Sequence, residues 1–177
     1  NKLNFDTETG LGYKIVIPII FRDFKIIKDI NKGAYSSVVQ VEDQNTKIIY
    51  AAKIIPKLNI ESKSQLHLIN KEIDILSNIT HPNIVKLFST IELTNDKKEE
   101  FIILIEEFCP NGSLLNYVNT EGFKNKKEVR LVSRGITEAI KYLHDEGIAH
   151  CDIKPENILL TKDNIPKLCD FNLSKYI

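Results

Sequence analysis

The sequence lacks an excess of charge of either sign, and it has little cysteine. Lys and Arg number 24 and Asp and Glu number 24, so the formal net charge is zero. Composition therefore gives no reason to expect a nucleic-acid partner or a membrane-surface partner. The 3 cysteines have neither metal-site spacing nor the density of a disulfide framework. Their scarcity predicts an intracellular, cytoplasmic protein.

Long apolar runs are also missing, since none approaches the ~20 residues that cross a bilayer. The β-branched run at 13–21 is short and is interrupted by Pro18. Residues 1–12 are polar with two glycines, which is typical of a tail or linker. We therefore treat 1–23 as an N-terminal extension of the domain that follows.

From residue 24 onward the pattern predicts an α+β protein. Apolar runs between turns predict five strands, at 24–30, 38–43, 47–55, 84–93 and 101–108. Apolar residues recurring at steps of three and four predict helices over 61–78 and 126–145, and a short helix begins near Ser113. Because strands dominate the first part and helices the second, we expect two lobes with a hinge at 109–112.

Two features of the first part could bind phosphate. The turn NKGAYSSV at 31–38 keeps Gly33, with Asn31 and Ser36 at the outer positions of a G-x-G-x-x-G pattern. Asn tolerates positive φ, but the turn alone is better explained as an ordinary hairpin. Lys53 lies within an apolar strand and needs solvent or an anion such as Glu72. Lys53 and Glu72, each taken alone, could equally be charged residues on a solvent-exposed surface.

The stretch HCDIKPENILL at 150–160 carries the clearest chemical signal. Asp152, Lys154 and Asn157 share a short loop, because Pro155 prevents a regular helix or strand there. A carboxylate, an amine and an amide fit phosphoryl transfer, and the apolar residues that follow argue against an ordinary surface loop. Asp170 follows another apolar run and, with Asn157, offers the oxygen ligands that Mg²⁺ prefers.

Taken together, these motifs resemble those of the eukaryotic protein kinase family, and more specifically those of its serine/threonine type. The matching segments are NKGAYSSVV, YAAK, Glu72, HPNIVKL, EEFCPNGSLL, HCDIKPEN and DFN. Lys53 and Glu72 lie 19 positions apart, and Asp152 and Asp170 lie 18 apart, as in the family. The resemblance implies a two-lobe fold: an antiparallel five-stranded N-lobe with one helix and an incomplete helical C-lobe.

The resemblance also implies domain limits and roles. The kinase domain would cover 24–177, with an N-lobe at 24–106, a hinge at 107–112 and a partial C-lobe at 113–177. The implied activity is transfer of the ATP γ-phosphate to Ser or Thr hydroxyls of a protein substrate, with Mg²⁺; no regulatory partner is implied. Asp152 and Lys154 would be catalytic, and Asn157 and Asp170 would bind the metal. The implied nucleotide-binding residues are Ile30, Asn31, Gly33, Ser36, Val38, Ala51, Lys53, Glu72, Glu107, Cys109 and Leu159.

Three positions depart from the family pattern. Cys151 replaces an arginine that pairs with a phosphorylated activation loop in the family, so we expect no such switch and a small buried thiol. Asn172 replaces a glycine of the metal-binding triplet, and because asparagine can take left-handed conformations, Asp170 can still point correctly. Glu106 occupies the expected gatekeeper position. These departures keep open a pseudokinase-like nucleotide-binding or scaffold module, or a non-functional truncation product, as alternatives.

Overall fold

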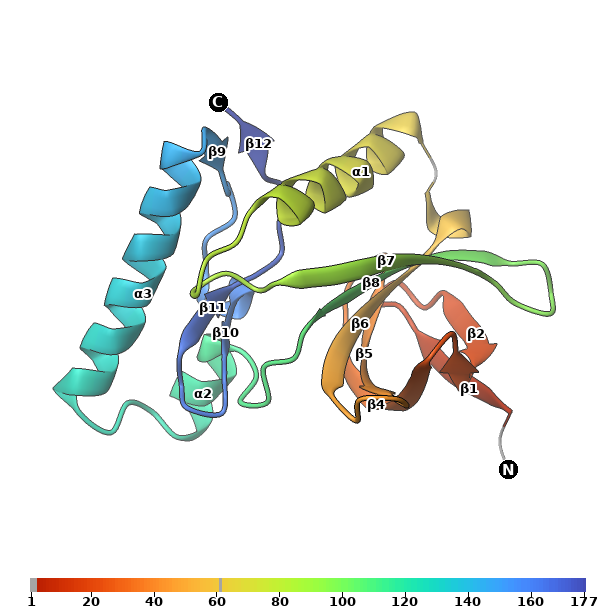
Figure 1. The fold of residues 1–177 in the computed structure, drawn as a ribbon, viewed down its shortest axis with the longest axis horizontal. Helices are drawn as coiled ribbons and strands as arrows, with labels where there is room; N and C mark the ends of the chain where they lie inside the picture. The colour runs from red at the N-terminus through yellow and green to blue at the C-terminus, as the bar shows by residue number, and fades with distance from the viewer. Residues whose placement is uncertain (1–2, 61) are drawn as a thin grey trace. The chain divides into compact units, whose positions relative to one another are not determined.

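The computed structural model describes residues 3–60 and 62–177, which form two compact units. The sheet unit comprises Asn1–Gln65 and Leu87–Phe108, and the helical unit comprises Leu66–Lys86 and Cys109–Ile177 (Figure 1). Each unit is described by itself below. Among the described residues, no helix is both long enough and apolar enough to cross a membrane.

An antiparallel sheet of six strands forms the body of the sheet unit, in the order β3-β4-β5-β6-β8-β7. The strands are β3 (Ile20–Phe21), β4 (Phe24–Lys32), β5 (Ser37–Asp43), β6 (Ile49–Pro56), β7 (Leu87–Thr94) and β8 (Glu100–Glu107). A single 3-10 turn, Lys57–Asn59, follows β6. The five strands predicted from the apolar runs are therefore confirmed, and the two-residue β3 adds a sixth.

One face of this sheet carries the core of the sheet unit. Val39, Ala52 and Ile105 pair across three neighbouring strands and are fully buried. Ile15 and Ile17 from the N-terminal segment join the same cluster. Fully burying a side chain of this size contributes about 1.5–3 kcal/mol, so the N-terminal segment is part of the core.

That N-terminal segment is a hairpin of β1 (Asn4–Glu8) and β2 (Lys14–Pro18). The prediction of a tail or linker over residues 1–12 is therefore wrong for β1. Polar composition hid the strand, although Phe5 and Thr7 alternate with exposed neighbours and Thr7 is buried. The run at 13–21 forms β2 and β3, as its β-branched composition predicts.

In the helical unit, most of α1, two further helices and four short strands pack together. Their bounds are α1 (Lys63–Asn78), α2 (Leu114–Thr120), α3 (Lys126–Asp145), β9 (Ile148–Ala149), β10 (Ile158–Leu160), β11 (Pro166–Leu168) and β12 (Lys175–Tyr176). β10 pairs with β11 and β12 pairs with β9, both antiparallel. A 3-10 turn, Pro155–Asn157, leads into β10.

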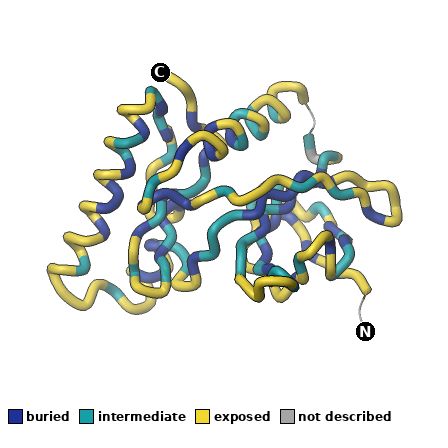
Figure 2. The backbone as a smooth tube through the Cα atoms, in the orientation of Figure 1, coloured by how far each residue is buried: buried dark blue, intermediate teal, exposed yellow. Residues whose placement is uncertain are grey.

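The longest helix, α3, has the bounds that its apolar periodicity predicts. Asn125 Oδ1 accepts from the Glu128 backbone N–H at 3.0 Å and caps the helix start. Gly147, at φ 69°, follows its end. Val132, Ile136 and Leu143 are buried along one side, and Figure 2 shows buried and exposed stretches alternating along α3.

Candidate active site

A loop between β9 and β10 brings together three residues predicted to carry the chemistry. Asn157 Nδ2 donates to the Asp152 carbonyl oxygen and to Asp152 Oδ2, each at 2.9 Å. Lys154 Nζ lies 3.1 Å from the same Oδ2, and this hydrogen bond and charge raise the pKa of Lys154. Asn157 is buried while Asp152 is half-buried. The amide therefore holds the carboxylate at the edge of solvent, where it can accept a proton.

The His150 ring fixes the backbone beside Asp152. Its Nε2 lies 2.9 Å from the Cys169 carbonyl oxygen, which only accepts, so Nε2 carries the proton. Its Nδ1 accepts from the Asp152 backbone N–H at 3.2 Å. Acceptance at Nδ1 requires the neutral ring, whereas the Nε2–H bond can form in either protonation state. Burial lowers the pKa of His150 and outweighs the nearby carboxylates of Asp170 and Asp152, which favour protonation.

Asp170 is joined to this loop through its neighbour in sequence. The Cys169 backbone N–H donates to the Asn157 carbonyl oxygen at 2.9 Å. The Phe171 side chain is fully buried, and its ring centroid lies 4.8 Å from that of His150. Asp170 takes a left-handed conformation, φ 60°. Non-glycine residues held in this conformation often mark functional sites.

The donor atoms present here fit a Mg²⁺ ion. Asp170 Oδ1 is a buried oxygen without a hydrogen-bond partner among the described residues, which is the environment of a carboxylate that binds a cation. Asn157 directs Nδ2 to Asp152, so its Oδ1 is the atom that can ligate. Across the described part of the chain, no cluster of three or more His, Cys, Asp or Glu could hold a metal. Mg²⁺ suits such a sparse set, because substrate phosphates usually complete its ligands.

In the sheet unit, Val38, Ala51 and Lys53 share one face. Val38 pairs with Lys53 across β5 and β6, and Lys53 pairs with Leu104 on β8. This face is opposite the one that carries the core of the sheet unit, because successive residues of a strand point to opposite sides. Glu106 pairs with Ala51 and so lies on the same face as Lys53, as its predicted gatekeeper role requires.

The loop at the end of β4 has the shape of a tight turn. The Gly33 backbone N–H donates to the Ser36 carbonyl oxygen at 2.9 Å. Asn31 pairs with Val38 in the ladder and is not among the described residues with positive φ. Asn31 was expected to replace a glycine because asparagine tolerates positive φ. In the structure Asn31 does not need that tolerance. Ile30 is exposed on the same strand.

The other predicted nucleotide-binding residues are divided between the units. Glu107 ends β8 in the sheet unit, whereas Glu72, Cys109 and Leu159 belong to the helical unit. Glu72 and Cys109 are buried and Leu159 is half-buried. The pairing of Lys53 with Glu72 and the adenine pocket stay predictions, as do the proposed lobe and hinge limits.

The structure shows the conformation of two of the departures, and one of them differs from expectation. Cys151 is exposed, at φ 66°, so the expectation of a buried thiol is wrong. Its side chain turns outward because the left-handed backbone redirects it, and its Sγ lies 3.6 Å from the Ala149 carbonyl oxygen. In the DFN triplet the left-handed residue is Asp170 and not Asn172. Asn172 therefore replaces a glycine without needing the conformation that glycine provides.

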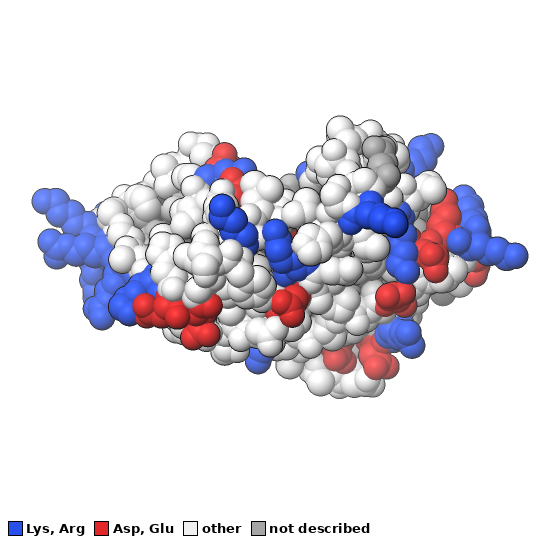
Figure 3. All heavy atoms as spheres, turned by 90° about the horizontal axis from the view of Figure 1, so that it is seen from above, with Lys and Arg blue, Asp and Glu red and all other residues white. Residues whose placement is uncertain are grey.

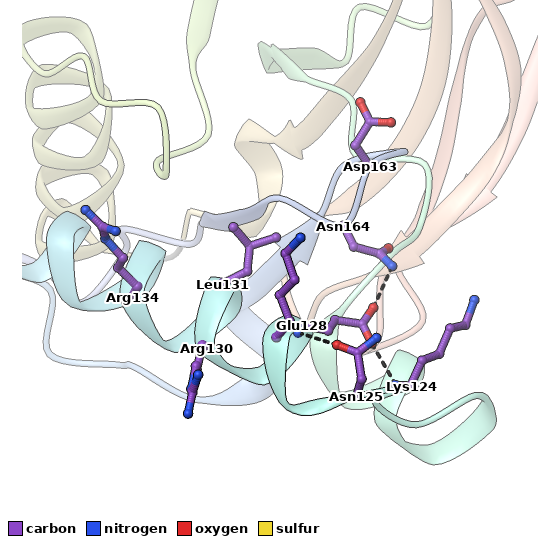
Figure 4. A pocket seen from close by; sticks show the side chains of 9 residues that line it. Lys124, Asn125, Glu128, Arg130, Leu131, Arg134, Asp163 and Asn164 are labelled. Carbon is purple, nitrogen blue, oxygen red and sulfur yellow. Dashed lines mark hydrogen bonds between the residues drawn. The ribbon is translucent and has the colours of Figure 1, made fainter.

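A shallow hollow of about 460 Å³ lies elsewhere in the helical unit, between the start of α3 and the β10–β11 turn. Figure 3 shows Lys and Arg side chains gathered over this α3 end of the unit. No sequence motif indicated the hydrogen-bonded cluster beside it, in which Glu128 Oε1 accepts from Tyr117 and Asn164. In Figure 4 the labelled cations Lys124, Arg130 and Arg134 point in different directions. None of the predicted catalytic residues lines the hollow.

Known proteins were compared with this chain. The family described as protein kinase domain matches residues 24–177. The 3-phosphoinositide-dependent protein kinase B of Dictyostelium discoideum is 42% identical over 155 residues, covering 88% of this chain and 16% of that protein. The human 3-phosphoinositide-dependent protein kinase 1 is 35% identical over 155 residues, covering 88% and 27%.

A third relative, the serine/threonine-protein kinase RAD53 of Saccharomyces cerevisiae, is 35% identical over 159 residues, covering 88% of this chain and 18% of that protein. Among these three relatives the chain spans between 16% and 27% of each protein's length. The mixed α+β fold and the kinase resemblance predicted from the motifs are confirmed. Since the family match extends from residue 24 to residue 177, the chain belongs to the protein kinase family.

Proposed function

We propose that this chain carries the catalytic machinery of an ATP- and Mg²⁺-dependent serine/threonine protein kinase. The supporting observation is the hydrogen-bonded set of Asp152, Lys154 and Asn157. The buried, unpartnered oxygen of Asp170 adds a metal ligand to this set. A base, a cation and two oxygen ligands are the parts that phosphoryl transfer requires.

In the proposed reaction Asp152 accepts the proton of a substrate hydroxyl. The hydroxyl oxygen forms a bond to the γ-phosphorus of ATP while the bond from that phosphorus to ADP breaks. Lys154, kept protonated by its raised pKa, offsets negative charge on the transferred group. Asn157 and Asp170 would hold Mg²⁺, which neutralises phosphate charge when bound. Lys53 on β6 would contact the α- and β-phosphates.

The substrate class rests on sequence and on relatives. Lys154, Pro155 and Glu156 follow Asp152 in the serine/threonine style. The relatives include a serine/threonine-protein kinase and 3-phosphoinositide-dependent protein kinases. We therefore propose Ser and Thr residues of a protein as phosphate acceptors and, from the low cysteine content, a cytoplasmic location.

Thermal melting with and without Mg-ATP tests the nucleotide site directly. Ligand at 100 times its Kd stabilises a folded protein by about 2.7 kcal/mol, so the wild-type Tm should rise. Asp170→Ala should lose the Mg²⁺-dependent part of that rise, and Asp163→Ala, at an exposed acidic residue of the same unit, should keep it. A wild-type Tm that does not change when Mg-ATP is added would contradict the proposal.

Activity is tested in the full-length protein that contains this chain. Removing a general base typically lowers the rate by about 10²–10⁴-fold, so Asp152→Ala should lose nearly all phosphate transfer to protein. Phosphoamino-acid analysis of the product should find phosphoserine and phosphothreonine. Equal phosphorylation by wild type and Asp152→Ala would exclude the catalytic role of this carboxylate.

A further inference from the structure

The N-terminal hairpin is hydrogen-bonded to the loop that the kinase resemblance places over the phosphates. The Gly10 backbone N–H donates to the Gly33 carbonyl oxygen at 2.5 Å, and the Leu11 backbone N–H donates to the Ala34 carbonyl oxygen at 3.2 Å. Both donors lie in the turn between β1 and β2. Two consecutive carbonyls of the loop are therefore held by a segment outside the matched kinase domain, which begins at residue 24.

These two bonds determine where the amide hydrogens of the loop point. In a trans peptide unit the C=O and the following N–H point in opposite directions. With the Gly33 and Ala34 carbonyls turned toward the hairpin, the N–H groups of Ala34 and Tyr35 are turned away from it. Successive N–H groups directed to one side form a concave site for an anion such as a phosphate.

Side chains on β1 anchor the hairpin on the strands that flank this loop. The buried Thr7 Oγ1 donates to Asp29 Oδ1 at 2.6 Å and lies 3.0 Å from Ser37 Oγ. The Lys32–Glu8 ion pair, at 3.1 Å, joins the same segments but is exposed, so it adds little. The hairpin thus contacts β4, the loop and β5 in succession.

The close approach explains why residue 10 is glycine. A Cβ added at Gly10 would lie 2.9 Å from the Gly33 carbonyl oxygen and 3.3 Å from the Ala34 nitrogen, both backbone atoms. An added Cβ at Gly12, in the same turn, meets nothing within 4 Å among the described residues. Only one of these two glycines is therefore required by contact with the loop.

We infer that the hairpin of residues 4–18 is a positioning element that holds the 31–36 loop with its N–H groups directed at the triphosphate of ATP. Gly10 is its central positioning residue. The loop has one glycine, Gly33, where the family pattern has three, and the hairpin supplies restraint from outside the domain. This inference rests on the proposed nucleotide-binding function and deepens it.

Calorimetric titration with two probes tests the inference. The probes are the magnesium complex of a non-hydrolysable ATP analogue and adenosine, which lacks phosphates. Gly10→Ala should weaken binding of the ATP analogue roughly five- to tenfold, the effect of losing about one hydrogen bond, and should leave adenosine affinity unchanged. Gly12→Ala, which strains the same turn at φ 83° without touching the loop, should bind both probes like wild type.

Thr7→Val provides a second variant that adds no bulk at the loop. It removes the hydroxyl that bonds Asp29 and Ser37, and it should show the same selective loss in smaller degree. If Gly10→Ala fails to fold, Thr7→Val decides the question. Unchanged analogue affinity in these variants, or an equal loss for both probes, would overturn the inference. A wild-type chain that binds neither probe would instead overturn the proposed function and the inference with it.

Discussion

The loop at 150–157, proposed above as the catalytic loop, and the loop at 31–36, proposed above as the phosphate-covering loop, are held in place in different ways. In the catalytic loop, Asn157 bonds Asp152 five residues away, and His150 bonds the Asp152 N–H. In the phosphate-covering loop, the carbonyls of Gly33 and Ala34 are held by a hairpin much earlier in the chain. The hydrogen bonds to Asp152 therefore come from its own sequence neighbours, whereas two carbonyls of the other loop are held by a separate segment.

This difference predicts different effects of mutation in the two loops. Residues of the catalytic loop act through bonds that the short motif itself contains, so changing them should disturb the loop directly. Residues of the hairpin act across strands, through the close backbone approach at Gly10 and the side-chain hydrogen bonds of Thr7, so their effects depend on the exact position changed.

Asn157→Ala should break the local network most severely. It removes the two hydrogen bonds to Asp152, one of them to a carboxylate, and leaves a small cavity at a buried position. The free energy of unfolding should fall by about 2–3 kcal/mol, measured by urea denaturation. Asn111→Ala, at an exposed loop asparagine, should change it by less than about 0.5 kcal/mol. Equal losses in both variants would contradict the special role of Asn157.

The same contrast explains what could be predicted from sequence. Asp152 and Asn157 lie within one short motif, whose spacing places a carboxylate and an amide in the same loop, and in the structure the two side chains are hydrogen-bonded. Gly10 and Thr7 gave no comparable signal, because their partners lie on other strands or in the 31–36 loop and the polar composition of β1 suggested a tail. The exposure of Cys151 was missed because it depends on the backbone φ of that single residue.

A glycine in α3 tests whether close approach also matters within the helical unit. A Cβ added at Gly135 would lie 2.7 Å from Asn83 Nδ2 and from Pro166 Cγ. Asn83 cannot move freely, because its Nδ2 donates to the Pro166 carbonyl oxygen at 3.0 Å. Helix propensity alone would make Gly135→Ala stabilising by about 1 kcal/mol, but overpacking should reverse the sign and destabilise by about 1–2 kcal/mol.

Chemical denaturation of Gly135→Ala beside Ser133→Ala checks this reversal. Ser133 is exposed on the same helix, so its replacement should be neutral or slightly stabilising, by a few tenths of a kcal/mol. A more stable Gly135→Ala chain would show that the helix can shift away from Asn83 and Pro166. The close contacts would then not constrain the packing of α3.

Acidification should gradually lower the free energy of unfolding, because it acts on a histidine of the catalytic loop. Burial lowers the folded-state pKa of His150 below its ordinary value of 6.5, so the unfolded chain takes up a proton that the folded chain resists. Its contribution to stability is therefore present above pH 6.5 and is lost as the pH falls through the folded-state pKa. His81, whose pKa is also lowered by burial, acts in the same direction.

Unfolding measured at several values between pH 5 and pH 7 separates these two histidines. His150→Gln should reduce the slope of the unfolding free energy against pH, whatever its effect on stability at pH 7. His81→Gln should remove a different part of the same slope. An unchanged slope in His150→Gln would show that this ring is not the titrating group. The neutral tautomer assigned from its hydrogen bonds would then be wrong.

The smallest effect concerns the backbone at Cys151. A non-glycine residue in the left-handed region costs about 1–2 kcal/mol, and glycine avoids this cost but makes the unfolded chain more flexible. Cys151→Gly, at φ 66°, should therefore raise the free energy of unfolding by up to about 1 kcal/mol. Cys169→Gly, at a position without positive φ, should lower it. If both variants are destabilised equally in urea, the left-handed turn does not strain Cys151, and contacts of its side chain must maintain the loop.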